Sequence, residues 1–244
     1  MATPSEPGGE PRLVWERPEP PSRPAPSPLS RDGIVRAAVE LADTDGLESV
    51  SLRKVAAALG AGPMRLYGYL STKDELLDLM ADAVYGEITP PGPAAEDWRA
   101  ALRTLAHRTR QAARRHEWFA DLLGGRPHVG PNALAYLEAS MAALDDAPGF
   151  GHIDTVMQAV STVNAYVVGA VRAEITELRA ERATGLDERQ WQDAFGPYMG
   201  RMLATGRYPT LVKVVTDATH PGPDTTFDAG LNYVLDGIAT HLTH

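Results

Sequence analysis

From Ser30 to its C-terminus, this chain repeats its apolar residues with the period of an α-helix almost without interruption. Strand signals are absent, because β-branched runs are short and no alternation of polar and apolar residues is sustained. No segment recurs at a fixed period. The sequence therefore predicts an all-α protein. The first apolar stripe is formed by Ile34, Val35, Ala38, Val39, Leu41 and Ala42.

Capping and breaking residues divide this helical pattern into segments. Ser30 is a suitable N-cap and Gly46 a suitable stop for the first helix. Thr72 and Glu75 have the spacing of a capping box, which opens a helix to residue 88, and the prolines and glycine of 89–93 end it. The remaining predicted helices are 51–59, 63–69, 95–115, 132–144, 153–182, 187–204 and 225–242.

Length and composition bound the kind of protein. With 244 residues, 43% of them hydrophobic, the chain can bury the core of one large or two modest domains. The absence of cysteine excludes disulfides, zinc–thiolate sites and cysteine nucleophiles, and suits a reducing cytoplasm. The first residues lack a signal-peptide profile, and no apolar stretch approaches the roughly 18 residues of a membrane helix. We expect a cytoplasmic protein without a membrane contact.

Residues 1–29 contain nine prolines and little apolar content, which is typical of a disordered or extended arm. A basic arm can enter a DNA minor groove. Here glutamates roughly cancel the arginines, which favours a solvated tail. The arginines are Arg12, Arg17 and Arg23, and the glutamates that alternate with them are Glu10, Glu16 and Glu19. The expected organisation is this arm, a small helical unit at 30–75 and a larger helical unit at 76–244.

The two short helices at 51–59 and 63–69 have the spacing of a helix-turn-helix. Ala56 is small enough for the second helix to approach, Gly60 supplies the sharp turn, and Leu66 closes the small core. Such a motif presents the N-terminal end of its second helix to the major groove. An ordinary helical hairpin shares this spacing, but several nearby donors favour DNA binding. These donors are Arg53, Arg65, Tyr67, Tyr69 and Lys73.

The formal net charge of −9 counts against a general nucleic-acid binder, which is usually basic. Overall charge, however, governs long-range attraction rather than the fit of a specific docking surface. A dimer with a small DNA-reading face can therefore be acidic elsewhere.

Residues 29–79 closely resemble the TetR family of one-component repressors. The resemblance rests on D-x-x-G-L at 43–47, S-L-R-K-V-A-x-x-L-G at 51–60, M-x-L-Y at 64–67 and S-T-K-D-E-L-L at 71–77. A weaker resemblance to the effector domain of the tetracycline-repressor subgroup rests on Trp98, L-G-G-R-P at 123–127 and the segment 227–242. The Pro-rich start is similar to extended actinomycete-type members, whose arms sometimes add DNA contacts.

The resemblance implies a homodimeric repressor that binds an inverted-repeat operator in double-stranded DNA and is released by a small-molecule effector. It implies DNA contacts at Ser51 and Arg53, at Pro63, Met64 and Arg65 facing base edges, and at Tyr67, Tyr69 and Lys73 gripping phosphates. If Arg65 reaches a guanine, it can pair with O6 and N7 together. Gly68 departs from the bulky residue usual at its position, so the operator cannot be borrowed from a relative.

The family arrangement pairs the helices at 153–182 and 225–242 with their symmetry mates in a four-helix bundle. The alternative is that both are internal core helices. Candidate effector-binding residues are His107, Trp118, Phe119, Tyr136, Met141, Met157, Asn164 and Tyr166, for each of which core packing or a surface position is the alternative. Asn164 is the most informative, because an amide on an apolar helix needs a hydrogen-bond partner.

The resemblance also bears on the effector. Tetracycline repressors place a histidine before the L-G-x-R-P segment to hold a drug-bound magnesium ion, whereas this chain has Leu122, and Gly125 replaces a hydroxyl-bearing residue. These departures argue for a bulky, partly apolar effector, with no metal and no cofactor. We expect the ligand to change the separation of two heads through the helix at 73–88, so that ligand and DNA weaken each other's binding.

Two other kinds of protein have less support. An enzyme is disfavoured, because the sequence lacks H-E-x-x-H, E-x-x-H pairs, G-x-S-x-G and a P-loop. Gly149, Phe150 and Gly151 lack the preceding strand that a dinucleotide loop requires. The other alternative is a helical adaptor that binds protein partners and no longer binds DNA. Only Gly68 and the acidic balance support it.

Overall fold

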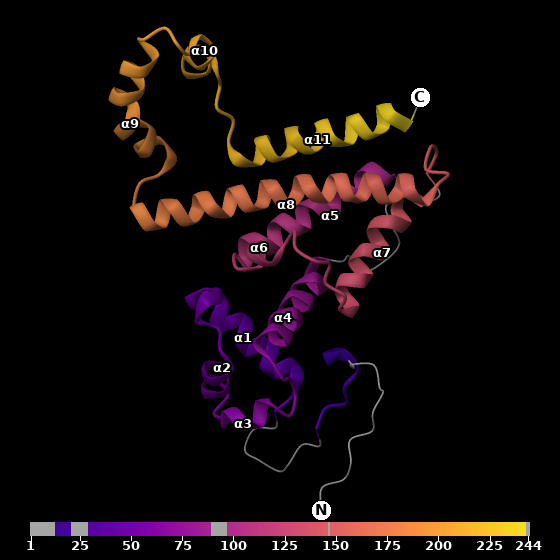
Figure 1. Ribbon diagram of the computed structural model, residues 1–244. Coiled ribbons are helices and arrows are strands. Elements are labelled where there is room, and N and C mark those ends of the chain that lie inside the picture. The colour runs from indigo at the N-terminus through magenta and orange to yellow at the C-terminus, as the bar shows by residue number, and fades with distance from the viewer. Residues whose placement is uncertain (1–12, 21–28, 89–96, 146, 243–244) are drawn as a thin grey trace, which may run out of the picture.

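The computed structural model describes residues 13–20, 29–88, 97–145 and 147–242 (Figure 1). These ranges contain eleven α-helices, two short 3-10 turns and no strand, which confirms the predicted all-α fold. The 3-10 turns are η1 (Val14–Glu16) and η2 (Leu47–Ser49). The helices are α1 (Arg31–Asp45), α2 (Leu52–Ala58), α3 (Pro63–Leu66), α4 (Lys73–Ile88), α5 (Trp98–Arg115), α6 (Phe119–Leu122), α7 (Pro131–Asp145), α8 (Ile153–Thr184), α9 (Glu188–Leu203), α10 (Pro209–Asp217) and α11 (Pro223–Leu242).

Helices α1, α2 and α3 form a small head at one end of the molecule (Figure 1). The Oγ of Ser30 accepts the N–H of Gly33 at 3.1 Å and caps α1, and Gly46, with a φ of +81°, ends it as predicted. Because α2 and α3 are too short to be stable alone, packing must hold them in place. The head buries Ile34, Ala38, Val55, Ala56, Leu66 and Leu70.

Helix α4 leaves the head and enters the body, where it packs against α5 and α7 (Figure 1). It begins where the capping box predicts. Thr72 Oγ1 accepts the N–H of Glu75 at 3.1 Å, while the carboxylate of Glu75 accepts the N–H of Ser71 at 2.6 Å. Since α4 also packs against α1, it is a rigid connection between head and body.

The body is built around α8, a helix of 32 residues that lies antiparallel beside α11 (Figure 1). The two helices pack together, and α5, α6 and α7 cover α8 between it and the head. One stripe of α8 faces this core and buries Val156, Val160, Val163, Val167 and Val171. None of the helices in the described ranges combines the length and the hydropathy needed to cross a membrane.

Helices α9 and α10 project from the ends of α8 and α11, away from the body (Figure 1). Asp187 and Gln190 form a reciprocal cap at the start of α9, with N–H to oxygen distances of 2.7 and 3.0 Å. Neither helix of this projection buries a residue. An apolar surface therefore remains uncovered in the single chain.

The structure differs from the sequence-based expectations in some helices and in the arm. Helices α6 and α10 escape prediction, because α6 is a single turn and α10 is dominated by β-branched residues, which have low helix propensity. The expectation of a disordered or extended arm is wrong for Val14–Glu16, because these residues form η1, which buries Val14 in the hydrophobic core. The rest of the arm up to residue 28, including Arg12 and Arg23, lies outside the described residues. The helix break at 89–93 and the start of the helix predicted at 95 lie outside them too.

Candidate DNA-binding surface and effector site

Helices α2 and α3 meet in the geometry that the spacing of Ala56, Gly60 and Leu66 predicts. Gly60 has a left-handed φ of +61°, and the N–H of Ala61 donates to the carbonyl of Ala56 at 2.9 Å, which closes the turn. Ala56 and Leu66 are fully buried. Pro63 occupies the first turn of α3, where its missing N–H is not needed. The second helix is therefore held rigidly, with its N-terminal end in solvent.

The outer surface of this motif is exposed and carries cations. The exposed residues among the predicted DNA contacts are Arg53, Pro63, Met64, Arg65, Tyr67 and Lys73. Met64 has 80% of its surface exposed, although it lies in a helix that buries Leu66 completely. Within the described ranges, no carboxylate pairs with Arg53, Arg65 or Lys73. These three cations can therefore meet phosphates or bases without first breaking an ion pair.

Two of the predicted DNA contacts have a role inside the head. Ser51 Oγ accepts the N–H of Lys54 at 3.3 Å and caps α2, and its DNA contact stays a prediction. The phosphate contact predicted for Tyr69 is wrong. Its side chain is buried and its hydroxyl donates to the carbonyl of Leu29 at 2.7 Å, which ties the end of the motif to the start of α1.

Four of the predicted effector residues gather in an inner cluster around Tyr85, a residue of α4. The rings of Phe119 and Tyr136 each lie 5.3 Å from the ring of Tyr85, and Trp118 lies 6.3 Å from Phe119. The Tyr136 hydroxyl donates to Asn164 Oδ1 at 3.0 Å, so this amide has the partner that the sequence demands. Burial raises the pKa of Tyr85 to about 12. Because Tyr85 belongs to α4, the residues of the inner cluster contact the helix that leads to the head.

The other four predicted effector residues lie elsewhere. His107 Nε2 is 2.9 Å from an oxygen of Asp228, and the Tyr166 hydroxyl donates to the carbonyl of Phe227 at 2.7 Å, so both contact α11. Tyr166 also lines a groove of about 830 Å³ bounded by α8, α9 and α11. Met141 is partly buried against the core and Met157 is exposed. The eight residues are thus divided among several environments.

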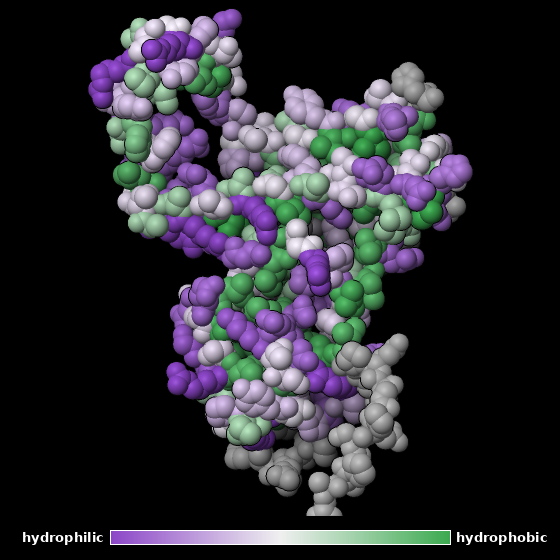
Figure 2. Space-filling model, viewed as in Figure 1, coloured by the Kyte–Doolittle hydropathy of each residue, from purple (hydrophilic) through white to green (hydrophobic). Residues whose placement is uncertain are grey.

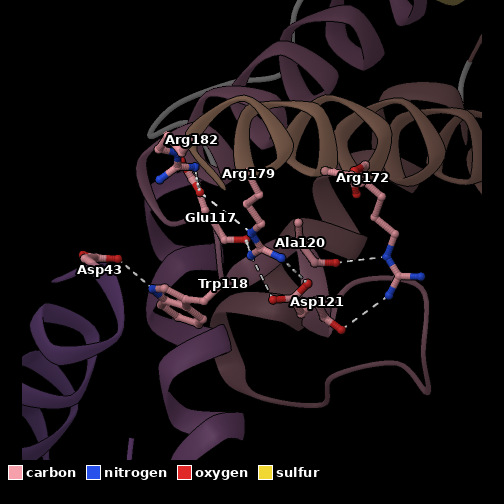
Figure 3. A network of polar contacts seen from close by, with 9 residues as sticks. Asp43, Glu117, Trp118, Ala120, Asp121, Arg172, Arg179 and Arg182 are labelled. Carbon is pink, nitrogen blue, oxygen red and sulfur yellow. Dashed lines mark hydrogen bonds and ion pairs between the residues drawn. The ribbon is translucent and has the colours of Figure 1, made fainter. Parts of the chain in front are cut away.

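Three arginines of α8 hold the segment that contains α6 (Figure 3). The bonds are Arg172 Nε to the carbonyl of Ala120 (3.0 Å), Arg179 Nη1 to Asp121 (2.9 Å) and Arg182 to Glu117. Because a guanidinium offers several donors in a fixed fork, such bonds define orientation as well as distance. The α6 segment is therefore tied to the longest helix of the body.

The same segment reaches the head through Asp43, near the end of α1 (Figure 3). Trp118 Nε1 donates to Asp43 Oδ1 at 2.6 Å, and His116 Nδ1 lies 2.8 Å from the same oxygen. Both side chains are buried, so the loss of this acceptor would leave polar groups unsatisfied. Asp43 thus provides a connection between head and body besides the predicted one through α4.

A second carboxylate, Asp82, joins α4 to α7. Its Oδ1 accepts the N–H groups of Asn132 at 3.0 Å and Ala133 at 2.9 Å, in the first turn of α7. Burial raises the pKa of Asp82, although these hydrogen bonds oppose the shift. A Cβ at Gly130 would overlap the same oxygen, so only glycine admits this arrangement.

Sequence reasoning missed Asp43, Asp82 and Tyr85. Asp82 and Tyr85 carried a usable signal, because they lie in a helix whose neighbouring positions are strongly apolar. Asp43 carried none, since an aspartate near a helix end is ordinarily a solvated residue.

The fold and this surface define a class of protein: a helical DNA-binding regulator whose helix-turn-helix head is joined to a larger body. Residues 34–80 match the family described as bacterial regulatory proteins of the tetR family, and residues 90–242 match the tetracyclin repressor-like C-terminal domain. The chain belongs to the TetR family, as the resemblance predicts.

Individual relatives support membership of this family. The HTH-type transcriptional repressor DrrR1 of Streptomyces coeruleorubidus is 38% identical over 228 residues, which cover 93% of this chain and 83% of the relative. An HTH-type transcriptional regulator of Saccharopolyspora erythraea is 46% identical over 166 residues, which cover 68% of this chain and 69% of that regulator. ActR of Streptomyces coelicolor in complex with actinorhodin superposes with a TM-score of 0.74 at 26% identity, over 88% of this chain and 97% of ActR. The chain is a DNA-binding transcriptional regulator of this family.

Proposed function

We propose that the chain is a repressor that binds an inverted-repeat operator as a homodimer and is released by a small-molecule effector. In this proposal residues 30–75 read the DNA, and residues 76–244 bind the effector and form the dimer. The observation that carries it is the exposed cationic face of the head, whose Arg53, Arg65 and Lys73 pair with no carboxylate in the described ranges. Two connections join this head to the body: helix α4, and the hydrogen bond from the buried Trp118 to Asp43.

The front of α3 is proposed to read the base sequence. Pro63, Met64 and Arg65 lie at its exposed N-terminal end, which helix-turn-helix proteins direct into the major groove. The guanidinium of Arg65 matches the paired acceptors O6 and N7 of guanine. Phosphate contacts are assigned to the flanking residues Arg53, Tyr67 and Lys73, because such contacts define register.

The dimer is proposed to form through α8 and α11, with help from the projection. Ala165, Gly169 and Ala173 lie exposed on α8, on a face that the valines of the core do not use. Tyr233 of α11 has 78% of its surface exposed. Small residues allow a second pair of helices to approach closely. Two heads placed about 34–36 Å apart would meet successive major grooves.

The effector is proposed to be a bulky, partly apolar molecule that contacts the inner cluster of Trp118, Phe119, Tyr136 and Asn164. Actinorhodin is the ligand named for ActR, which supports a ligand of this class. Leu122 and Gly125 argue against a magnesium-bound tetracycline.

The switch is proposed to act on both helices that leave the head. A ligand in the inner cluster would displace Tyr85 on α4, and it would displace the Trp118 segment that holds Asp43 on α1. Ligand and operator then weaken each other's binding by one common factor, as linkage requires.

Fluorescence anisotropy with DNA from upstream of the protein's own coding region tests the DNA-binding part. Affinity should fall steeply as salt rises. Arg65→Ala should lose about 1–3 kcal/mol of binding free energy and relax the preference at one base position. Arg126→Ala, in the exposed loop between α6 and α7, is the matched control and should bind like the wild type. An Arg65→Ala variant with unchanged affinity and base preference would contradict the assignment.

Thermal denaturation tests the effector part. Actinorhodin, used as a probe, should raise the melting temperature and lower operator affinity, because a ligand that binds the folded state stabilises it. Magnesium with tetracycline is the control and should do neither. If no bulky apolar compound in a panel stabilises a protein that still binds DNA, the effector proposal fails.

A further inference from the structure

Residues 13–20 of the N-terminal arm lie on the head, and we call them the strap. Val14 is 3% exposed and belongs to the hydrophobic core, and Trp15 packs partly buried against this core beside residues of α1 and α4. The carboxylate of Glu16 accepts the N–H of Leu13 at 3.0 Å, which closes the turn that presents Val14. The strap therefore has its own hydrophobic anchor.

Arg17 connects the strap to the junction between α3 and α4. Its Nη1 donates to Ser71 Oγ at 2.9 Å, and its Nη2 lies 2.5 Å from Glu75 Oε1. The other oxygen of Glu75 accepts the N–H of Ser71 at 2.6 Å, so both members of the ion pair are hydrogen-bonded to Ser71. Burial opposes ionisation of Glu75, but the hydrogen bonds from Arg17 and Ser71 outweigh it and lower its pKa. This junction has the recognition helix on one side and Lys73 on the other.

A second arginine, Arg31, ties the strap to the first turn of α1. Its Nη2 donates to the carbonyl of Arg17 at 2.8 Å, and its backbone N–H donates to Glu19 Oε1 at 3.0 Å. The strap therefore bridges the first helix of the head and the end of the recognition helix, which are distant in sequence.

Gly68 is where the strap comes close to the recognition motif. A Cβ at this position would lie 3.3 Å from Cγ of Pro20, which is tighter than an ordinary van der Waals contact. The missing side chain at Gly68, which the sequence shows as a departure, therefore makes room for the strap.

We propose that the strap is an integral part of the DNA-binding head, and that Arg17 and Gly68 are positioning residues that hold α3 in the orientation required for operator binding. The proposal rests on the proposed function, because it requires a head that binds operator DNA. It assigns no DNA contact to Arg17, whose guanidinium is engaged by Ser71 and Glu75. Loss of the strap should change affinity without removing phosphate contacts.

The first test measures operator affinity of the full-length protein across a salt series. Arg17→Ala is expected to weaken binding about tenfold while the slope of log affinity against log salt stays that of the wild type, because no phosphate contact is lost. Lys73→Ala is the comparison and is expected to reduce this slope by about 1. Wild-type affinity for Arg17→Ala, or a slope reduced as in Lys73→Ala, would overturn the proposal. Failure of the wild type to bind would instead overturn the proposed function, and the strap proposal with it.

The second test leaves the ion pair intact. Gly68→Ala is expected to weaken operator binding about tenfold, and adding Pro20→Ala, which removes the crowding Cγ, is expected to restore it to within about twofold of Pro20→Ala alone. Melting temperatures are measured in parallel, since a merely structural role would lower them and leave the affinity of the folded protein unchanged. A Gly68→Ala variant that binds like the wild type, or whose loss Pro20→Ala does not restore, would overturn the proposal.

Discussion

The head and the α9–α10 projection are both built from amphipathic helices, but their apolar residues have opposite fates. Helix α3 has only four residues, and Leu66 within it is completely buried. Helix α9 has 16 residues, and its Trp191 and Phe195 are each 49% exposed. Figure 2 shows apolar side chains on the outside of the projection.

This difference teaches that the length of a helix does not determine whether its apolar face is covered. The short helices of the head are covered by their neighbours in the same chain. The projection instead keeps an aromatic surface, in which the rings of Trp191 and Phe195 lie 4.7 Å apart. Monomeric proteins rarely expose large apolar patches. The head is therefore complete within one chain, and a second copy is the proposed cover for the projection.

Truncation of the head core should have the largest effect. Leu66→Ala removes a fully buried side chain and should lower the free energy of unfolding by about 2–5 kcal/mol. Met64→Ala, two residues earlier and 80% exposed, should change it by less than about 0.5 kcal/mol. Chemical denaturation measures both. Equal losses in the two variants would show that the head is not self-sufficient.

Truncation of the projection should act on assembly rather than on the head. Trp191→Ala should weaken dimerisation by about 2 kcal/mol, as expected of an aromatic residue at the centre of an interface. Sedimentation velocity across a concentration series measures this change, with the exposed Asp193→Ala as the control. An unchanged dimer would exclude α9 from the interface.

The connection between head and body should show a smaller effect. Asp43→Ala removes the acceptor of two buried groups, Trp118 Nε1 and His116 Nδ1, and should destabilise the protein by about 1–2 kcal/mol. Asp45→Ala, exposed at the end of the same helix, should be nearly neutral. Thermal denaturation separates the two. Once an effector is found, Asp43→Ala should also reduce its effect on operator affinity.

The smallest effect should come from acid. Because the pKa of Glu75 is lower in the folded protein than its ordinary value of 4.5, the carboxylate contributes stability above that pH and loses it as pH falls through the folded-state pKa. Glu75→Gln should therefore be less stable than the wild type at pH 7 and should lose less stability between pH 5 and 3. Melting curves at both ends of this range measure the difference. If the melting temperatures of the two proteins fall equally between pH 5 and 3, the carboxylate of Glu75 does not contribute this stability.

The sequence predicts the local features of this fold well. Ser30 and Gly46 bound α1, Asp187 and Gln190 cap α9, and the helical period identifies α8 and α11, because caps and periodicity depend on neighbouring residues only. The turn at Gly60 is predictable for the same reason.

The remaining features depend on residues far apart in the chain. No local pattern brings Asp43 to Trp118 or Asp82 to the start of α7. Tyr69 is misjudged because its hydroxyl suggests a phosphate contact, whereas packing of the head directs it to the carbonyl of Leu29. The strap is missed because the prolines around Val14 and Trp15 conceal two apolar anchors.

Hydroxyl-radical footprinting of the full-length protein on its own upstream DNA tests the central claim most directly. The account predicts an inverted repeat with two protected half-sites whose centres lie about 10 base pairs, or a multiple of one helical turn, apart, one for each head of a dimer. A single protected half-site, or protection that does not distinguish this DNA from a scrambled sequence, would contradict it.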